Sequence, residues 1–145
     1  MNPDTAVPPA VRAAILATAT PRCAYVYDRA VLRAQARALR AALPPESLLL
    51  YAVKANGHPG VVDALADAVD GFEVASGGEL AIARAAARPD QAIVMGGPGK
   101  TEDELRAAVE AGATVNVESA LELRRLSTVA ERVGRPVRAT LRVNR

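Results

Sequence analysis

The chain has 145 residues, 50% of them hydrophobic and 23% charged, with a formal net charge of +2. This length suits one domain with a buried core, and the composition excludes a disordered tail and a coiled-coil rod. No apolar stretch approaches the ~18 residues of a membrane-spanning helix, so we expect no membrane association. The 16 arginines and two lysines alternate with acidic residues. Without a basic stripe, we expect no nucleic-acid partner.

Residues 1–27 are predicted to form an N-terminal arm followed by a strand. The first twenty residues are rich in Pro and Ala and suit an arm or a loose helix. Cys23–Tyr27 combines aromatic and β-branched residues, which favours a strand in which Cys23 is packed. A single cysteine forms no internal disulfide and fits a reducing compartment, so we expect a cytoplasmic protein.

From residue 28 onward, helices and strands are predicted to alternate. Asp28 is a suitable N-cap for a helix over residues 29–43, whose leucines fall on one side. Two later helices, capped by Thr101 and Ser119, carry a glutamate three residues after the cap, as in a capping box. The other predicted helices span 59–69 and 78–87, and the predicted strands span 47–53, 72–75, 91–95, 114–117 and 137–143.

This alternation predicts an α/β fold with parallel strands joined by right-handed crossovers. Two architectures fit, an open doubly wound sheet and a (β/α)8 barrel. A barrel needs eight βα units and ~250 residues, whereas this chain holds four units and a fifth strand. Length alone therefore favours the open sheet.

Functional residues in both architectures lie at the carboxyl ends of the strands. Lys54 ends the first of these strands and is one of two lysines in the chain. A partly desolvated amine there is a nucleophile toward carbonyls, although a lysine that reaches solvent fits equally well. The other strand ends are also polar or glycine-rich, at 76–78, 96–99, 118–119 and 142–144.

Two further features of the sequence are interpreted as structural. The segment GGPGKT at 96–101 lacks the glycines that a phosphate loop or a dinucleotide-binding turn needs at positions 94 and 102, so it is predicted to be a tight turn. His58 is the single histidine and is predicted to be a solvated or capping residue. With no second histidine and no cysteine pair, no metal site is expected.

Five motifs in a fixed order resemble a known family. The resemblance is to the N-terminal part of the fold-type III pyridoxal-phosphate decarboxylases, the diaminopimelate and ornithine decarboxylase group, and it covers about residues 23–145. The motifs are YAVKAN at 51–56, GFEVASGGEL at 71–80, GGPGKT at 96–101 with Glu104-Leu105, VES at 117–119 with Glu122-Leu123, and LRVN at 141–144.

The resemblance implies a partial (β/α)8 barrel of the alanine racemase-like type in place of the open sheet. Residues 28–145 are expected to form its N-terminal part, with the family's C-terminal β-domain absent from the chain. The cofactor implied is pyridoxal 5'-phosphate, held covalently by the catalytic amine of Lys54. The resemblance also places Glu73, Glu79 and Arg142 in the polar network beside the cofactor.

The activity implied is decarboxylation of an amino acid, with a diamino acid or a siderophore precursor as substrate and a homodimer as the complete enzyme. An amino-acid racemase on the same barrel and a non-catalytic pyridoxal-phosphate-binding or regulatory fragment are the alternatives. In the family, the cofactor-stacking histidine, the glycine-rich phosphate loop and the acidic partner of the pyridine nitrogen lie beyond the position of Arg145. We therefore expect residues 1–145 alone, as a fragment, to be inactive.

Overall fold

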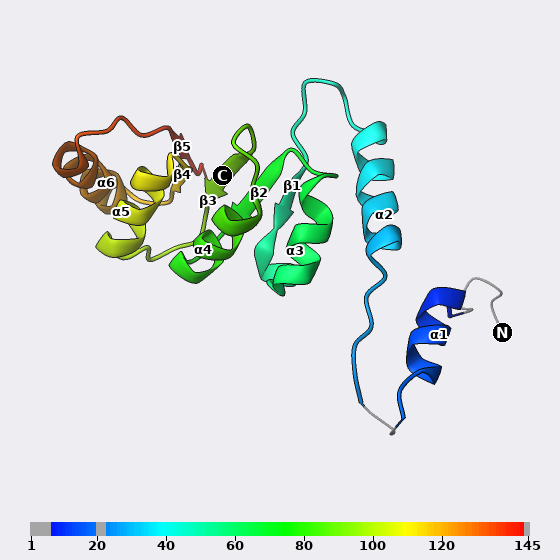
Figure 1. Ribbon diagram of the computed structural model, residues 1–145. Helices are drawn as coiled ribbons and strands as arrows, with labels where there is room; N and C mark the ends of the chain where they lie inside the picture. Colours follow the sequence, from blue (N-terminus) through cyan, green and yellow to red (C-terminus); the bar gives the residue numbers. More distant parts are fainter. Residues whose placement is uncertain (1–6, 20–22, 144–145) are drawn as a thin grey trace.

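A five-stranded parallel sheet forms the centre of the computed structural model, which describes residues 7–19 and 23–143 (Figure 1). The strands are β1 (Leu50–Ala52), β2 (Gly71–Val74), β3 (Ala92–Met95), β4 (Thr114–Val117) and β5 (Ala139–Leu141). The helices are α1 (Pro9–Leu16), α2 (Arg29–Ala42), α3 (Pro59–Ala66), α4 (Gly77–Ala86), α5 (Glu102–Ala111) and α6 (Ala120–Val133), with a 3-10 turn, η2 (Val53–Ala55), after β1.

The order of the strands distinguishes between the two expected architectures. The sheet runs β1-β2-β3-β4-β5, so every strand pairs in parallel with the next strand of the chain. A doubly wound sheet instead reverses its strand order at a switch point. Successive right-handed crossovers in one direction place all helices on the same side of the sheet, which is the winding of a barrel. The open sheet that length alone favours is therefore wrong.

One side of the sheet packs against the helices and the other carries polar side chains. Phe72, Val74, Met95 and Val115 alternate along their strands and are fully buried in the core with the apolar sides of α3, α4, α5 and α6. Residues between them point the other way, as Glu73 does, and are half-buried. The barrel interior is therefore the polar side of this sheet.

The helix ends follow the capping residues of the sequence. Asp28 accepts hydrogen bonds from the N–H groups of residues 30 and 31 at the start of α2. Thr101 and Glu104 form the predicted capping box of α5. Gly112 and Gly134 end α5 and α6 in the left-handed conformation, with φ of 69° and 70°. These predictions are confirmed, but the second predicted capping box is wrong, because Glu122 accepts from the N–H of Glu118 and not from that of Ser119.

The N-terminal part of the chain differs from its prediction in one respect. The loose helix is present as α1, which buries none of its residues and lies apart from the sheet (Figure 1). The strand predicted over 23–27 is wrong, because these residues form neither helix nor strand. They pair with no strand of the described chain, which leaves Cys23 exposed and Tyr25 91% exposed. Among the described residues, no helix has the length and apolar character needed to cross a membrane.

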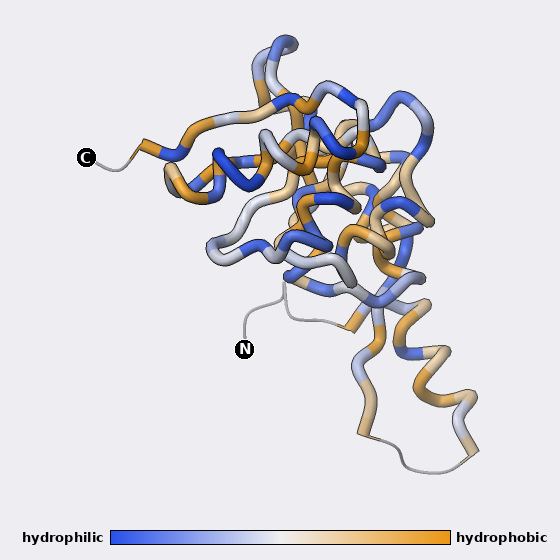
Figure 2. The backbone as a smooth tube through the Cα atoms, turned by 90° about the vertical axis from the view of Figure 1, so that its left-hand side faces the viewer, coloured by the Kyte–Doolittle hydropathy of each residue, from blue (hydrophilic) through white to orange (hydrophobic). Residues whose placement is uncertain are grey.

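Three strands are shorter than predicted, β3 by one residue and the first and last strands by four each. The first begins at Leu50 rather than 47 and ends at Ala52, so that Lys54 lies in η2 and not in a strand. The last spans Ala139–Leu141 and is exposed along its length. The residues near its end alternate between hydrophobic and hydrophilic, as Figure 2 shows. Among the described strands, β5 pairs with β4 alone, which explains why the residues at its two ends lack regular structure.

Gly71 is required by the close approach of β2 to β3. A Cβ atom at this position would lie 2.1 Å from the carbonyl oxygen of Ala92 and 2.9 Å from its carbonyl carbon. Both are backbone atoms of the neighbouring strand, where Gly71 is in register with Ala92. β3 cannot move away from Gly71 without breaking its hydrogen bonds to β2.

We predict that Gly71→Ala lowers the free energy of unfolding by at least about 2 kcal/mol, because the new methyl group overpacks two backbones. Gly78→Ala is the matched control, since its Cβ would meet only the Ser76 hydroxyl at 3.9 Å. Within α4 that substitution stabilises by up to about 1 kcal/mol. Urea denaturation of both variants measures the difference, and equal effects would contradict the packing argument.

Candidate functional site

Lys54 and Glu73 meet at the carboxyl edge of β1 and β2. The Nζ atom of Lys54 lies 3.2 Å from Oε2 of Glu73, and the lysine side chain is 61% exposed. The other carboxylate oxygen of Glu73 lies beside Gly96, the residue after β3, where a Cβ atom would be 3.0 Å from it. Glycine at 96 therefore leaves room for the Glu73 carboxylate.

The turn that carries Lys54 is fixed by its neighbours. The Tyr51 hydroxyl donates to the carbonyl oxygen of Asn56 at 3.1 Å. Burial raises the pKa of Tyr51 above its usual 10.0, so the hydroxyl keeps its proton at neutral pH. The Asn56 side chain accepts from the N–H of His58, whose Nδ1 accepts from Gly60 as the N-cap of α3. The predicted capping role of His58 is confirmed.

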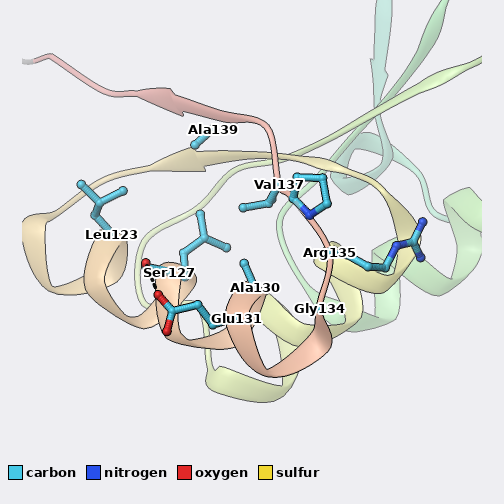
Figure 3. Close-up of a pocket in the computed structure, with 10 residues that line it drawn as sticks. Leu123, Ser127, Ala130, Glu131, Gly134, Arg135, Val137 and Ala139 are labelled. Atoms are coloured by element: carbon cyan, nitrogen blue, oxygen red, sulfur yellow. Dashed lines mark hydrogen bonds between the residues drawn. The ribbon is translucent and has the colours of Figure 1, made fainter.

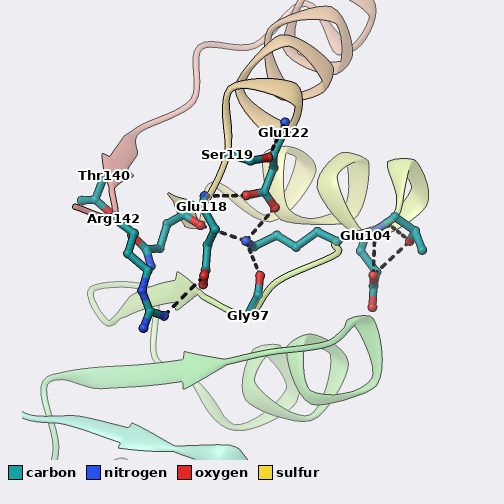
Figure 4. A network of polar contacts seen from close by, with 10 residues as sticks. Gly97, Glu104, Glu118, Ser119, Glu122, Thr140 and Arg142 are labelled. Carbon is teal, nitrogen blue, oxygen red and sulfur yellow. Dashed lines mark hydrogen bonds and ion pairs between the residues drawn. The ribbon is translucent and has the colours of Figure 1, made fainter. Parts of the chain in front are cut away.

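Arg142 lies at the opposite end of the same edge. Its Nη1 atom is 3.3 Å from Oε2 of Glu118, the residue that follows β4. Two residues earlier on each strand, the Thr140 hydroxyl donates to the Asn116 side chain at 3.1 Å. Side chains in and just after β4 and β5 are thus joined in two successive pairs, of which Figure 4 shows Glu118 with Arg142.

The structure brings some of the predicted site residues together and keeps others apart. Lys54 contacts Glu73, whereas Arg142 contacts Glu118, which the sequence prediction did not include. Glu79 lies in the first turn of α4, where its Oε2 atom accepts from the N–H of Ala75 at 2.8 Å. Among the described residues, the side chain of Glu79 makes no other hydrogen bond.

Lys100 is a second polar centre, and the sequence prediction missed it. Its side chain is 1% exposed, and its Nζ atom donates to three oxygens, the Gly97 carbonyl at 2.7 Å and the Asn116 carbonyl and Glu122 Oε1 at 2.8 Å. A compact ammonium suits three converging acceptors better than a planar guanidinium does. The rarity of lysine, with two lysines among 18 Lys and Arg residues, is the signal in the sequence that could have identified Lys100.

Glu104 joins the starts of two helices. Its Oε2 atom accepts from the N–H of Thr101 at the start of α5, and its Oε1 atom accepts from the N–H of Gly77 at the start of α4. These hydrogen bonds to the charged form lower the pKa of Glu104 below its usual 4.5. The carboxylate therefore fixes the α4 turn relative to the α5 turn.

A groove elsewhere on the molecule contains none of these residues. It lies between α6 and the segment 134–139, and apolar side chains such as Leu123, Ala130 and Val137 line most of it (Figure 3). It presents no cluster of nucleophilic or cationic groups. Among residues 7–19 and 23–143, no three His, Cys, Asp or Glu side chains are arranged to hold a metal ion.

A parallel sheet wound in one direction is the architecture of a (β/α) barrel, and an exposed lysine beside a carboxylate lies at the carboxyl ends of its strands. Residues 29–145 match the family described as "Pyridoxal-dependent decarboxylase, pyridoxal binding domain". The chain belongs to this family, and the resemblance found in its sequence motifs is confirmed.

Similar proteins of known structure or activity support the same fold. The 2-[(L-alanin-3-ylcarbamoyl)methyl]-2-hydroxybutanedioate decarboxylase of Staphylococcus aureus is 41% identical over 86% of this chain and 31% of its own length. A diaminopimelate decarboxylase from Helicobacter pylori, complexed with L-lysine, matches with a TM-score of 0.78 and 31% identity over 92% of this chain and 34% of that chain.

An alanine racemase from Streptomyces coelicolor also matches, with a TM-score of 0.67 and 31% identity over 81% of this chain and 32% of that chain. The chain spans about a third of the length of these relatives. Together with the strand order, they identify the sheet as the N-terminal part of a (β/α)8 barrel.

We predict that stability falls on acidification through the pKa of Glu104. Because this pKa is lower in the folded than in the unfolded state, the contribution is fully present above the usual value of 4.5 and is lost as pH falls through the folded value. In wild type, the urea midpoint of unfolding should fall at acidic pH, and Glu104→Gln should make this fall smaller. Glu110→Gln, near the other end of α5, should leave the fall unchanged. Parallel curves for wild type and Glu104→Gln would contradict this role.

We predict that the two lysines differ sharply in their contribution to stability. Lys100→Met leaves the carboxylate of Glu122 buried without its counter-ion and lowers the free energy of unfolding by about 3–5 kcal/mol. Lys54→Met removes an exposed amine and changes it by less than about 0.5 kcal/mol. Thermal and urea denaturation measure both. A Lys100→Met variant as stable as Lys54→Met would show that the buried pair is not needed for folding.

Proposed function

We propose that this chain is the N-terminal part of a pyridoxal-phosphate-dependent amino-acid decarboxylase in which Lys54 is the catalytic amine. The observation that carries the proposal is the contrast between the two lysines. The amine of Lys100 is buried and donates to three oxygens, whereas the amine of Lys54 is exposed at the carboxyl edge of the sheet. Lys54 is therefore the lysine that a bound aldehyde can reach.

The residues at this edge fit pyridoxal phosphate in their chemistry. A primary amine suits the aldehyde carbon, and Arg142 and the Glu79 Oε1 atom offer one cation and one acceptor for its polar groups. Gly96 keeps the space beside Glu73 free of a side chain. When bound, the cofactor supplies an electron sink for breaking a bond at the α-carbon of the substrate.

Each proposed site residue has a role that its position allows. Glu73 lies close enough to Lys54 to hold the ammonium in place and to accept a proton from Nζ. Arg142 supplies a positive charge suited to a phosphate or a carboxylate, and Glu118 directs it. Glu79 keeps the α4 turn in place through the N–H of Ala75 and leaves one oxygen for a ligand.

The substrate class that we propose is an amino acid with a second polar end, either a diamino acid or an amide-linked amino acid. The similarity to a diaminopimelate decarboxylase and to the S. aureus decarboxylase supports both forms. We also propose a cytoplasmic homodimer as the complete enzyme. Amino-acid racemisation is the second candidate, because an alanine racemase shares this half-barrel.

We predict that pyridoxal phosphate followed by borohydride labels Lys54 and leaves Lys100 unlabelled, since only the exposed amine can attack the aldehyde. Peptide mass spectrometry of the full-length protein locates the label. Lys54→Ala should abolish labelling of this peptide and turnover, because Lys100, the other lysine of residues 1–145, is buried. Label on Lys100 with none on Lys54 would refute the assignment.

Product assays of the same protein separate the two candidate activities. A decarboxylase releases carbon dioxide from a diamino acid, whereas a racemase inverts the α-carbon and releases none. Carbon dioxide release that disappears in Lys54→Ala supports the proposed function. Inversion alone would favour the racemase.

A further inference from the structure

The strand-to-helix turn that follows β4 is held from both sides by one buried ion pair. Glu122 uses Oε1 to accept from Lys100 and Oε2 to accept from the N–H of Glu118 at 2.7 Å. Lys100 itself donates to the carbonyl oxygen of Asn116, two residues before Glu118. The backbone on both sides of Val117 is therefore tied to the same ammonium, directly at one point and through a carboxylate at the other.

This turn ends in the side chain that meets Arg142. Glu118 is 15% exposed, and its Oε2 atom lies 3.3 Å from Nη1 of Arg142 (Figure 4). Asn116, whose carbonyl oxygen accepts from Lys100, also accepts from the Thr140 hydroxyl through its side chain. The two contacts, Asn116 with Thr140 and Glu118 with Arg142, thus each involve a residue whose backbone is hydrogen-bonded to Lys100 or to Glu122.

The neighbouring turns show that a buried cation is not needed merely to cap a helix. At the start of α4, Glu79 accepts from the N–H of Ala75 just as Glu122 accepts from that of Glu118, with no lysine beside it. At the start of α5, Glu104 accepts from the N–H groups of Gly77 and Thr101 and from the Thr101 hydroxyl, and no described cation lies within ion-pair distance of it. Lys100 directly precedes the cap of α5, yet its ammonium forms its ion pair with Glu122, next to the turn that carries Glu118.

Energetics also argue against a purely stabilising role for this pair. Removing two charges from water costs several kcal/mol per ion, and well-packed apolar residues in place of a buried ion pair are often neutral or stabilising. Hydrogen bonds with fixed directions, in contrast, define a geometry closely. A buried pair that fixes two backbone points on either side of one residue is suited to positioning that residue.

We propose that Lys100 and Glu122 are positioning residues that set the place of Glu118 and, through it, of the Arg142 guanidinium at the candidate site. The expected effect on pyridoxal-phosphate binding rests on the proposed function. The expected effect on the position of the Arg142 side chain does not depend on it. Lys100 and Glu122 touch neither the cofactor nor the substrate in this proposal and act only through the β4–α6 turn.

The test uses Lys100→Met/Glu122→Gln, which removes both buried charges together and so avoids leaving one without a partner. Phenylglyoxal modifies arginine side chains, and peptide mass spectrometry gives the rate at Arg142 in the cofactor-free, full-length protein. We expect this rate to rise several-fold in the double variant and in Glu118→Gln. We also expect the Kd for pyridoxal phosphate to rise about tenfold in both, as loss of a charged hydrogen bond predicts.

The decisive comparison combines the substitutions. If Lys100 and Glu122 act through Glu118, adding Lys100→Met/Glu122→Gln to Glu118→Gln changes neither the Arg142 rate nor the Kd further. Glu102→Gln/Arg132→Met is the matched control, because it removes an exposed ion pair between the same two helices, α5 and α6. That control should leave both quantities at their wild-type values.

Three outcomes would overturn the inference. These are an unchanged Arg142 rate in the double variant, fully additive effects in the Glu118→Gln background, and an Arg142 rate that Glu118→Gln alone does not alter. The last measurement needs no change in the buried pair and can therefore overturn the inference even where the double variant does not fold. Borohydride labelling of Lys54 in wild type tests the proposed function separately, since the Arg142 rate is measured without the cofactor.

Discussion

Each strand-to-helix turn at the carboxyl edge leaves backbone N–H groups that need an acceptor, and three successive turns of this fold use a glutamate for it. Glu79, Glu104 and Glu122 stand at the third position of α4, α5 and α6, and each accepts from an N–H at or before the helix cap. Two of them also reach the preceding βα unit, through Gly77 or Lys100. The shape of the polar edge depends on these carboxylates.

Local chemistry explains why much of the fold could be predicted from the sequence. Thr101 and Ser119 predict helix starts because their side chains accept from backbone N–H groups three residues later. Gly112 and Gly134 predict helix ends because glycine readily adopts the left-handed conformation found there. The strand 114–117 was predicted with the bounds that the structure shows. Strand order was the missing information, and the motifs supplied it where length favoured the wrong architecture.

The errors occurred where distant residues decide the structure. A β-rich composition at 23–27 cannot form a strand without a partner, and the described chain offers none. Lys54 leaves the strand because η2 begins at Val53, which is fully buried. Lys100 escaped notice because its three acceptors come from positions 97, 116 and 122, and their convergence is a property of the folded turns.

The sheet order β1-β2-β3-β4-β5 has a consequence for how the chain folds during synthesis. Each strand pairs only with strands adjacent to it in the chain, so a newly made βα unit finds its docking edge already in place. In a doubly wound order such as 3-2-1-4-5-6, by contrast, one strand must return across the sheet to pair beside the first strand. Each parallel pair closes over one crossover helix, and the ribosome delivers the units in the order in which the sheet grows.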